Sequence, residues 1–136
     1  MDEILGKKYK LKSSENFEDY LKYIEVGLFS RKTALAVTPT TTLVRNEDGS
    51  YTLILATTFR TVKTTFRLDE EFTEERADGI KVKCIFTIQG RKLIQTQVEE
   101  NGRTSTHIRE FTPELLTVTT TAEGWDGKCE RIYEAQ

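Results

Sequence analysis

Residues 100–127 read ENGRTSTHIREFTPELLTVTTTAEGWDG, and their pattern gives the clearest indication of the fold class. Turn-forming residues stand at its start, middle and end, in ENGR (100–103), TPEL (112–115) and EGWDG (123–127). The two segments between them are rich in Thr, Val, Ile, Leu and Phe, which favour extended backbone. Turns that recur every 9 to 12 residues or so, as here, are typical of short antiparallel strands joined by hairpins.

The same pattern runs from Pro39 to the last residue of the sequence. Further turn signals are NEDGS (46–50), LDEEF (68–72), ADGI (77–80) and QGR (89–91). With LGKKYKL (5–11) as a first strand, the chain holds roughly ten strands and no crossover helix. We therefore predict a mainly β fold, a ten-stranded antiparallel up-and-down barrel that removes its edges by closing on itself. Polar Thr residues on both faces suit a barrel with a partly hydrated interior.

One stretch has clear helical periodicity. In SSENFEDYLKYIEVG (13–27), an apolar stripe is formed by Phe17, Tyr20, Leu21 and Ile24. The hydroxyl of Ser13 or Ser14 is expected to cap this helix, and Gly27 ends it. LFSRKTALAV (28–37) predicts a second short helix before Pro39 restores extended backbone.

Length and composition limit the classes of protein. The chain has 136 residues, 37% hydrophobic and 31% charged, which predicts one globular domain spanning residues 1–136. The net charge of −2 gives no broad electrostatic surface for nucleic acid. No apolar run spans a membrane and no secretory signal opens the chain, so we expect a monomer of the cytoplasm, with the nucleus left open. Cys84 and Cys129 are expected to be buried, reduced thiols.

The sequence contains no recognisable catalytic motif. His107 is the one histidine and has no partner at metal-ligand spacing, and the glycines stand singly in turns. The charge runs DEEF (69–72) and TEER (73–76) are most simply solvated turn and edge residues. We therefore expect no enzyme, no metal and no cofactor.

Two strand segments place arginine on a face that also carries apolar residues. In an extended chain Arg109 shares a face with His107 and Phe111, and Arg131 shares one with Tyr133 and Cys129. If these faces point inward, the protein buries positive charge and needs an anion to compensate it. The alternative is that both arginines are exposed and pair with their neighbours Glu110 or Glu130.

Several segments together resemble the intracellular lipid-binding proteins, in particular fatty-acid-binding proteins of muscle or invertebrate type. The resemblance covers the whole chain, and the segments that carry it are YKL (9–11), ENFEDYLKYIEVG (15–27), TPTT (38–41), TTFR (57–60), FRLDEEFTEERADGIKVK (66–83), IREF (108–111) and KCERIYEAQ (128–136). It implies a lipocalin-like (calycin) barrel whose opening is covered by a helix-turn-helix lid. It also implies a carrier that binds one long-chain fatty acid.

The resemblance further implies roles for individual residues. Arg109, Arg131 and Tyr133 would hold the ligand carboxylate. The cavity wall and its portal would include Phe17, Tyr20, Leu21, Pro39, Phe59, Ala77 and Asp78. Two arginines indicate an acidic ligand, with retinoic acid as the alternative to a fatty acid.

The lid helices also carry positive charge. Lys22, Arg31 and Lys32 lie on or beside them and would approach an anionic membrane surface or a protein partner, unless they form an ordinary solvated helix face. The last turn, EGWDG, is longer than in many relatives and is expected to expose Trp125.

Overall fold

Ten strands make up about half of the computed structural model, which describes residues 1–76 and 78–136. The strands are β1 (Tyr9–Glu15), β2 (Thr40–Arg45), β3 (Tyr51–Ala56), β4 (Thr61–Phe66), β5 (Phe72–Glu75), β6 (Lys81–Gln89), β7 (Lys92–Val98), β8 (Thr104–Phe111), β9 (Leu115–Ala122) and β10 (Cys129–Ala135). A short 3-10 turn, η1 (Asp2–Ile4), precedes them, and α1 (Phe17–Tyr23) and α2 (Leu28–Ala36) lie between β1 and β2. The predicted mainly β class is confirmed.

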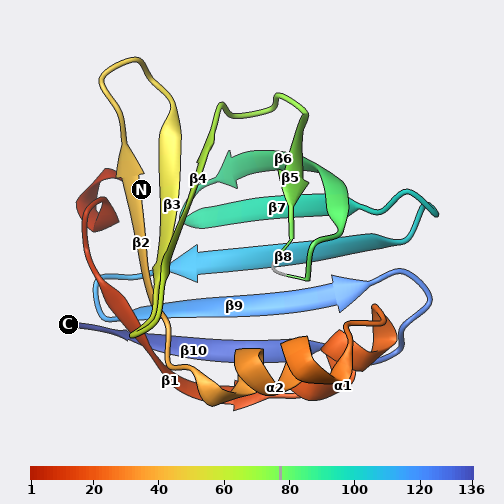
Figure 1. Ribbon diagram of the computed structural model, residues 1–136. Coiled ribbons are helices and arrows are strands. Elements are labelled where there is room, and N and C mark those ends of the chain that lie inside the picture. Colours follow the sequence, from red (N-terminus) through yellow and green to blue (C-terminus); the bar gives the residue numbers. More distant parts are fainter. Residues whose placement is uncertain (77) are drawn as a thin grey trace.

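The strands form one antiparallel sheet that curls into a barrel (Figure 1). Apart from β4 and β5, consecutive strands pair with each other, and β1 pairs with β10, so that the first and last strands lie side by side. Between β4 and β5 no ladder of backbone hydrogen bonds joins the described residues, so the sheet keeps two edges there. The predicted ten-stranded antiparallel barrel is confirmed, and it is nearly closed, with an opening between β4 and β5.

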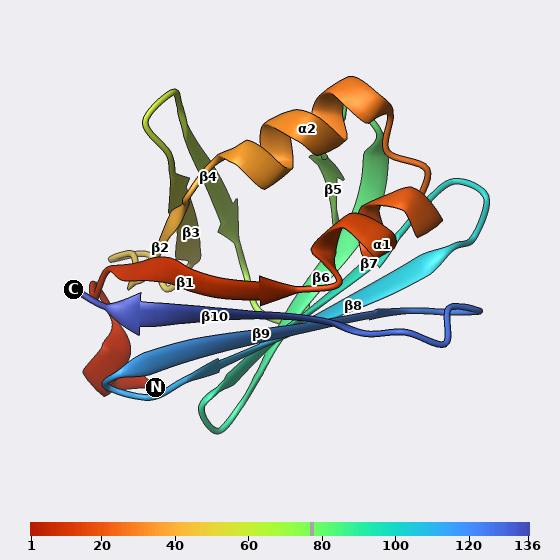
Figure 2. The same ribbon diagram turned by 90° about the horizontal axis from the view of Figure 1, so that it is seen from below.

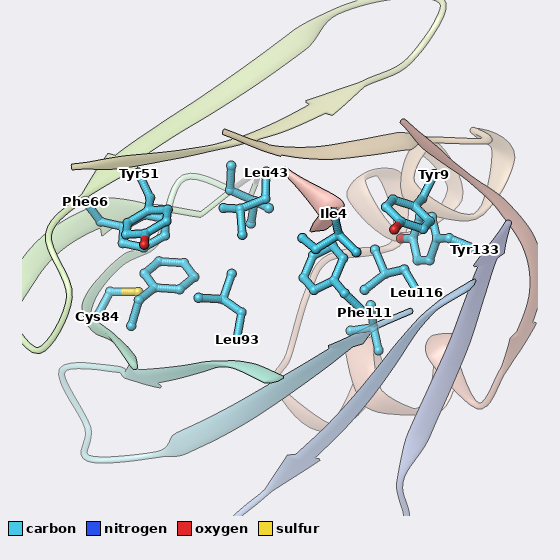
Figure 3. Packing of buried hydrophobic residues seen from close by; sticks show 13 residues of the cluster. Ile4, Tyr9, Leu43, Tyr51, Phe66, Cys84, Leu93, Phe111, Leu116 and Tyr133 are labelled. Atoms are coloured by element: carbon cyan, nitrogen blue, oxygen red, sulfur yellow. The ribbon is translucent and has the colours of Figure 1, made fainter. Parts of the chain in front are cut away.

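The interior is packed by large apolar side chains from nearly every strand. Tyr9, Phe86 and Phe111 are fully buried, and aromatic rings stack from Tyr51 through Phe66 onto Phe86. Figure 3 shows this main cluster crossing the barrel from Tyr51 and Phe66 to Tyr9 and Tyr133. A strongly apolar region of this kind stabilises the barrel and leaves the polar inward-facing side chains as the exception to explain.

The two helices lie side by side across one end of the barrel (Figure 2). Helix α1 packs onto it through Tyr20, Leu21 and Ile24, all buried as the periodicity predicts. Helix α2 has no buried residue, and its Phe29 is 85% exposed. The lid therefore has one firmly packed helix and one that rests on the surface. No helix within the described part of the chain has the length and apolar character needed to cross a membrane.

The boundaries of the first elements differ from the sequence prediction. Strand β1 begins at Tyr9, four residues later than expected for the segment 5–11, and continues through Ser13 and Ser14 to Glu15. These serines therefore pair with β10 and cap no helix. The residue at the N-terminal cap of α1 is Asn16, in a left-handed conformation with φ of 61°, which turns the chain sharply from strand to helix.

Candidate functional site

Arg109 and Arg131 lie on the same face of strands that flank one central strand. Arg109 of β8 and Arg131 of β10 are both paired with Val118 of β9, and Val118 is buried. Adjacent strands are about 4.8 Å apart, so the two arginine backbones lie about 10 Å apart with their side chains on one face. Two long side chains at this separation reach the same region of the barrel interior.

Arg131 is a buried cation that forms no hydrogen bond or ion pair with another described side chain. The residue is 8% exposed, and its Nε has no hydrogen-bond partner in the part of the chain that the structure describes. Its guanidinium carbon lies 3.8 Å from the ring centroid of Phe17 in α1. Stacking on an aromatic ring stabilises the charge but satisfies none of the N–H donors. The side chain is thus held in place while its donors remain available to an anion.

Within the described part of the chain, Arg109 forms one side-chain hydrogen bond, and its partner is a neutral group. Its Nη1 donates a hydrogen bond to Gln95 Oε1 at 2.8 Å, and its guanidinium carbon lies 6.0 Å from the ring centroid of Phe86. Burial lowers the pKa of Arg109, because the cation loses water around it. Among the described residues neither arginine forms an ion pair, so the alternative of exposed arginines paired with Glu110 or Glu130 is wrong.

Tyr133 lies one inward-facing position beyond Arg131 on β10. It is 5% exposed and is paired with Leu116 on one side and Leu11 on the other. Figure 3 places it beside Tyr9 and Leu116 at the edge of the apolar cluster. Unlike Tyr9, whose hydroxyl donates to the carbonyl of Thr112 at 2.7 Å, Tyr133 makes no hydrogen bond with a described side chain. Its hydroxyl is a neutral donor on the same face as Arg131.

A chain of polar side chains lies beside the two arginines, and the sequence analysis did not identify it. His107 Nδ1 is 2.8 Å from Thr120 Oγ1, and His107 Nε2 is 2.7 Å from Gln97 Oε1. Gln97 Nε2 in turn donates to Glu74 Oε2 at 3.3 Å. Burial lowers the pKa of His107 to about 3, with Arg109 adding to the shift, so the ring is neutral at pH 7. The shared face of His107 and Arg109 was the signal in the sequence.

Gln95 connects this chain to Arg109. Its Nε2 donates to Glu74 Oε2 at 3.1 Å and to Cys84 Sγ at 3.2 Å, while its Oε1 accepts from Arg109. Glu74 belongs to the run TEER (73–76), so the prediction that this run is solvated is wrong for Glu74. It is a half-buried residue of β5 that accepts two amide donors from β7.

The cavity and portal residues fall into different environments. Phe17 stacks on Arg131, Tyr20 donates from its hydroxyl to Ser105 Oγ at 2.9 Å, and Leu21 is buried beneath α1. Pro39 is buried, and Phe59, in the turn between β3 and β4, is 84% exposed. Asp78 lies in the β5–β6 turn and accepts two hydrogen bonds from Arg76, whereas Ala77 lies outside the described residues.

The three positively charged residues of the lid also differ in their exposure to solvent. Lys22 on α1 and Lys32 on α2 are exposed, as a membrane-facing role requires. Arg31 is half-buried, and its Nη1 donates to the carbonyl of Val26 at 2.7 Å. Trp125 is also only half-exposed, since it lies 5.8 Å from the ring centroid of Tyr20 and is stacked on Tyr23. The expectation of an exposed Trp125 is wrong.

Arg103 holds the C-terminal end of α1 against the barrel. Its Nη1 and Nη2 donate to the carbonyls of Tyr23 and Ile24, each at 3.1 Å. The same guanidinium binds both carboxylate oxygens of Glu99, at 2.7 and 2.8 Å. These bonds lower the pKa of Glu99, because they stabilise its charged form.

A second arginine extends this cluster to the β5–β6 turn. Arg76 Nη1 lies 3.5 Å from Glu99 Oε2, and its Nε and Nη2 donate to the two oxygens of Asp78 at 2.9 and 2.7 Å. The Arg76 hydrogen bonds lower the pKa of Asp78. The cluster ties α1 to two turns of the barrel.

The two cysteines are structural in character. Both thiols are free and buried, as predicted from the sequence. Burial raises the pKa of Cys84 to about 12 and that of Cys129 to about 11, so neither is a reactive thiolate at neutral pH. Within the described ranges no group of three or more His, Cys, Asp and Glu side chains is arranged to hold a metal ion.

Comparison with known proteins points in one direction. The chain is 39% identical over 135 residues to the muscle fatty-acid-binding protein of Schistocerca gregaria, covering 98% of each chain. Its fold is similar to that of a fatty-acid-binding protein from brain tissue of Drosophila melanogaster, with 42% identity, coverage of 97% and 99%, and a TM-score of 0.88. It is similar too to a Schistosoma mansoni fatty-acid-binding protein solved with arachidonic acid, at 32% identity, 100% and 98% coverage and a TM-score of 0.90.

The family model described as "Lipocalin / cytosolic fatty-acid binding protein family" matches residues 5–132, nearly the whole barrel. The ten-stranded antiparallel sheet and the two-helix lid agree with that match. The chain belongs to the lipocalin / cytosolic fatty-acid binding protein family.

Proposed function

We propose that the protein is a non-catalytic carrier, acting as a cytoplasmic monomer, that binds one long-chain fatty acid inside its barrel. The carboxylate is held by Arg109, Arg131 and Tyr133. The observation that carries this proposal is Arg131, a buried guanidinium whose Nε has no partner among the described residues. The comparisons add support, since relatives that cover nearly the whole chain are fatty-acid-binding proteins by name.

The carboxylate and the arginines stabilise one another. A buried cation without an anion is costly, and so is a buried carboxylate without donors. An arginine offers paired N–H donors that match the two oxygens of a carboxylate, and a tyrosine hydroxyl adds a third donor. Arg131 and Tyr133 stand on one face of β10, and Arg109 points to that face from β8.

The hydrocarbon chain of the ligand supplies most of the affinity. Each methylene removed from water contributes roughly 0.8 kcal/mol. In this proposal the chain runs along Phe17, Tyr20 and Leu21 of α1, which form the inner face of the lid. Pro39, Phe59 and Asp78 border the route by which it enters.

Titration of the delipidated protein tests the proposal. We expect saturable one-to-one binding of oleic acid, and binding of its methyl ester weaker by about tenfold or more, because the ester lacks the charge that Arg109 and Arg131 recognise. Isothermal titration calorimetry measures both affinities. The carrier role fails if neither ligand binds at one site. The carboxylate assignment fails if the acid and the ester bind equally well.

Retinoic acid is the alternative ligand, because any apolar chain that ends in a carboxylate meets the same three groups. Competition separates the two classes. In a fatty-acid carrier, oleic acid displaces bound retinoic acid at lower concentration than the reverse. The opposite order assigns the site to a retinoid.

We further propose that the lid delivers the ligand at anionic membrane surfaces through Lys22, Arg31 and Lys32. Phe29, next to this charge and 85% exposed, supports the idea because it offers an apolar group to the bilayer. Replacing Lys22 and Lys32 by Gln should slow transfer to anionic vesicles about fivefold per lysine. Transfer of a fluorescent fatty acid, followed by stopped-flow, measures the rate. A rate that is independent of salt and of both lysines would contradict the contact.

A further inference from the structure

Glu74 is the point at which two hydrogen-bonded arms meet inside the barrel. One arm runs from Thr120 through His107 and Gln97, and the other runs from Arg109 through Gln95. Both arms end on the same oxygen, Glu74 Oε2, at 3.3 and 3.1 Å. An unsubstituted hydrocarbon chain makes no use of such groups, and their burial costs free energy.

The direction of each hydrogen bond is set by the groups themselves. A carboxylate only accepts, so the amides of Gln95 and Gln97 turn their N–H groups towards Glu74 and their oxygens away from it. The oxygen of Gln97 then requires a proton on His107 Nε2, and His107 Nδ1 accepts from the hydroxyl of Thr120. Donors along both arms therefore point towards Glu74.

The two arms leave one hydrogen-bond acceptor and several hydrogen-bond donors unused among the described residues, and these could bind the same group. The second carboxylate oxygen, Glu74 Oε1, accepts no hydrogen bond from a described residue. Arg109 uses only its Nη1 among the described residues, although a guanidinium carries five N–H donors. An acceptor and a donor thus lie on either side of Gln95.

The cluster also has a defined place relative to the two arginines. Gln95, His107 and Thr120 are paired across β7, β8 and β9, which makes them one row of inward-facing positions. Arg109 and Arg131 belong to the adjacent row, two residues further along β8 and two residues from Cys129 on β10. Two residues of a strand span about 6.6 Å, so the rows are separated by a few bonds of an alkyl chain. If the carboxylate of a fatty acid is bound by the arginines, the carbon atoms near that carboxylate lie beside the cluster.

We infer that the Glu74–Gln95–Gln97–His107 cluster is a second polar subsite that takes a hydroxyl group on the chain of the bound acid. The preferred ligand class is then an oxygenated long-chain fatty acid. A hydroxyl both donates and accepts, so it can donate to Glu74 and accept from Arg109. A second carboxylate at this place is excluded by the charge of Glu74. The inference rests on the proposed carrier function, since the carboxylate anchor places the chain.

The test compares octadecanoic acid with a panel of octadecanoic acids that carry one hydroxyl at successive positions. We expect at least one hydroxy acid to bind the wild-type protein about tenfold more tightly than the plain acid. In Glu74→Gln, which keeps the size of the side chain and removes its charge, this ratio should fall to about two or less. The ratio of the two affinities measures the effect, so a general change in affinity cancels.

Glu75→Gln is the matched control, because Glu75 is the neighbouring residue of β5 and is exposed on its outer face. It should keep the wild-type ratio. The inference is overturned if no hydroxy acid is preferred by the wild type, if Glu74→Gln keeps the preference, or if Glu75→Gln loses it equally. If neither class of acid binds at all, the carrier function itself fails and the subsite fails with it. Binding of the plain acid without any preference overturns the subsite alone.

Discussion

Replacing Arg131 with methionine is expected to weaken the binding of a long-chain fatty acid at least tenfold and to stabilise the ligand-free protein by about 1 to 2 kcal/mol. The loss of affinity follows from the loss of charge-assisted hydrogen bonds to the carboxylate. The gain in stability follows because a buried cation with an unpartnered Nε is replaced by an apolar side chain of similar length. Loss of the stacking on Phe17 offsets part of that gain.

Two measurements check that the Arg131→Met substitution lowers the affinity for the ligand while it raises the free energy of unfolding. Calorimetric titration gives the affinity, and urea unfolding of delipidated protein gives the free energy of unfolding. Arg45→Met is the matched control, since the Arg45 side chain is 46% exposed and pairs with Asp2 at the surface. It should leave the affinity unchanged. A destabilised Arg131→Met protein with full affinity would show that Arg131 serves the fold and not the ligand.

Acidification is expected to destabilise the protein through His107 before the carboxyl groups titrate. Burial lowers the pKa of His107 from 6.5 to about 3 in the folded chain, so the unfolded chain binds the proton first. The stability contributed by the neutral ring is complete above pH 6.5 and is lost as the pH falls from there towards 3. At pH 5 the loss amounts to about 2 kcal/mol.

His107→Gln isolates this contribution. The amide keeps a donor and an acceptor for Gln97 and Thr120 but does not titrate. Because His107 is the one histidine of the chain, unfolding by urea at pH 7.5 and pH 5 should show the extra loss in the wild type and not in the variant. Equal losses in both proteins would mean that the ring accepts a proton in the folded state without cost.

The sequence was most informative where local chemistry determines structure. The turns with Gly, Asn or Pro, such as ENGR (100–103) and TPEL (112–115), lie between strands as predicted. The turn between β3 and β4 was missed because TTFR (57–60) has none of these residues. It is closed by Thr57, whose Oγ1 accepts from the backbone amides of Phe59 and Arg60.

Non-local partners explain the other differences. Ser13 and Ser14 look like helix caps, but pairing of β1 with β10 holds them in a strand. Glu74 and Arg76 look solvated within TEER (73–76), yet Gln95 and Gln97 bind the first, and Asp78 and Glu99 bind the second. Such contacts depend on residues distant in sequence, so no local pattern reveals them. Alternation along a strand, in contrast, correctly placed Arg109 and Arg131 on faces that carry apolar residues, but it left open whether those faces point inward.

The two lid helices differ in how firmly they pack against the barrel, and this difference determines which helix is expected to move more easily. Helix α1 would have to release Tyr20, Leu21 and Ile24 from the apolar packing and Arg103 from two backbone carbonyls before it could move. Helix α2 has no buried residue to release. Local unfolding takes the route of lowest free energy, so amide protons of α2 exchange with solvent through small openings while those of α1 wait for larger ones. We therefore expect α2 to open more readily than α1, and in the proposed carrier the rate of ligand exchange would follow the opening of α2.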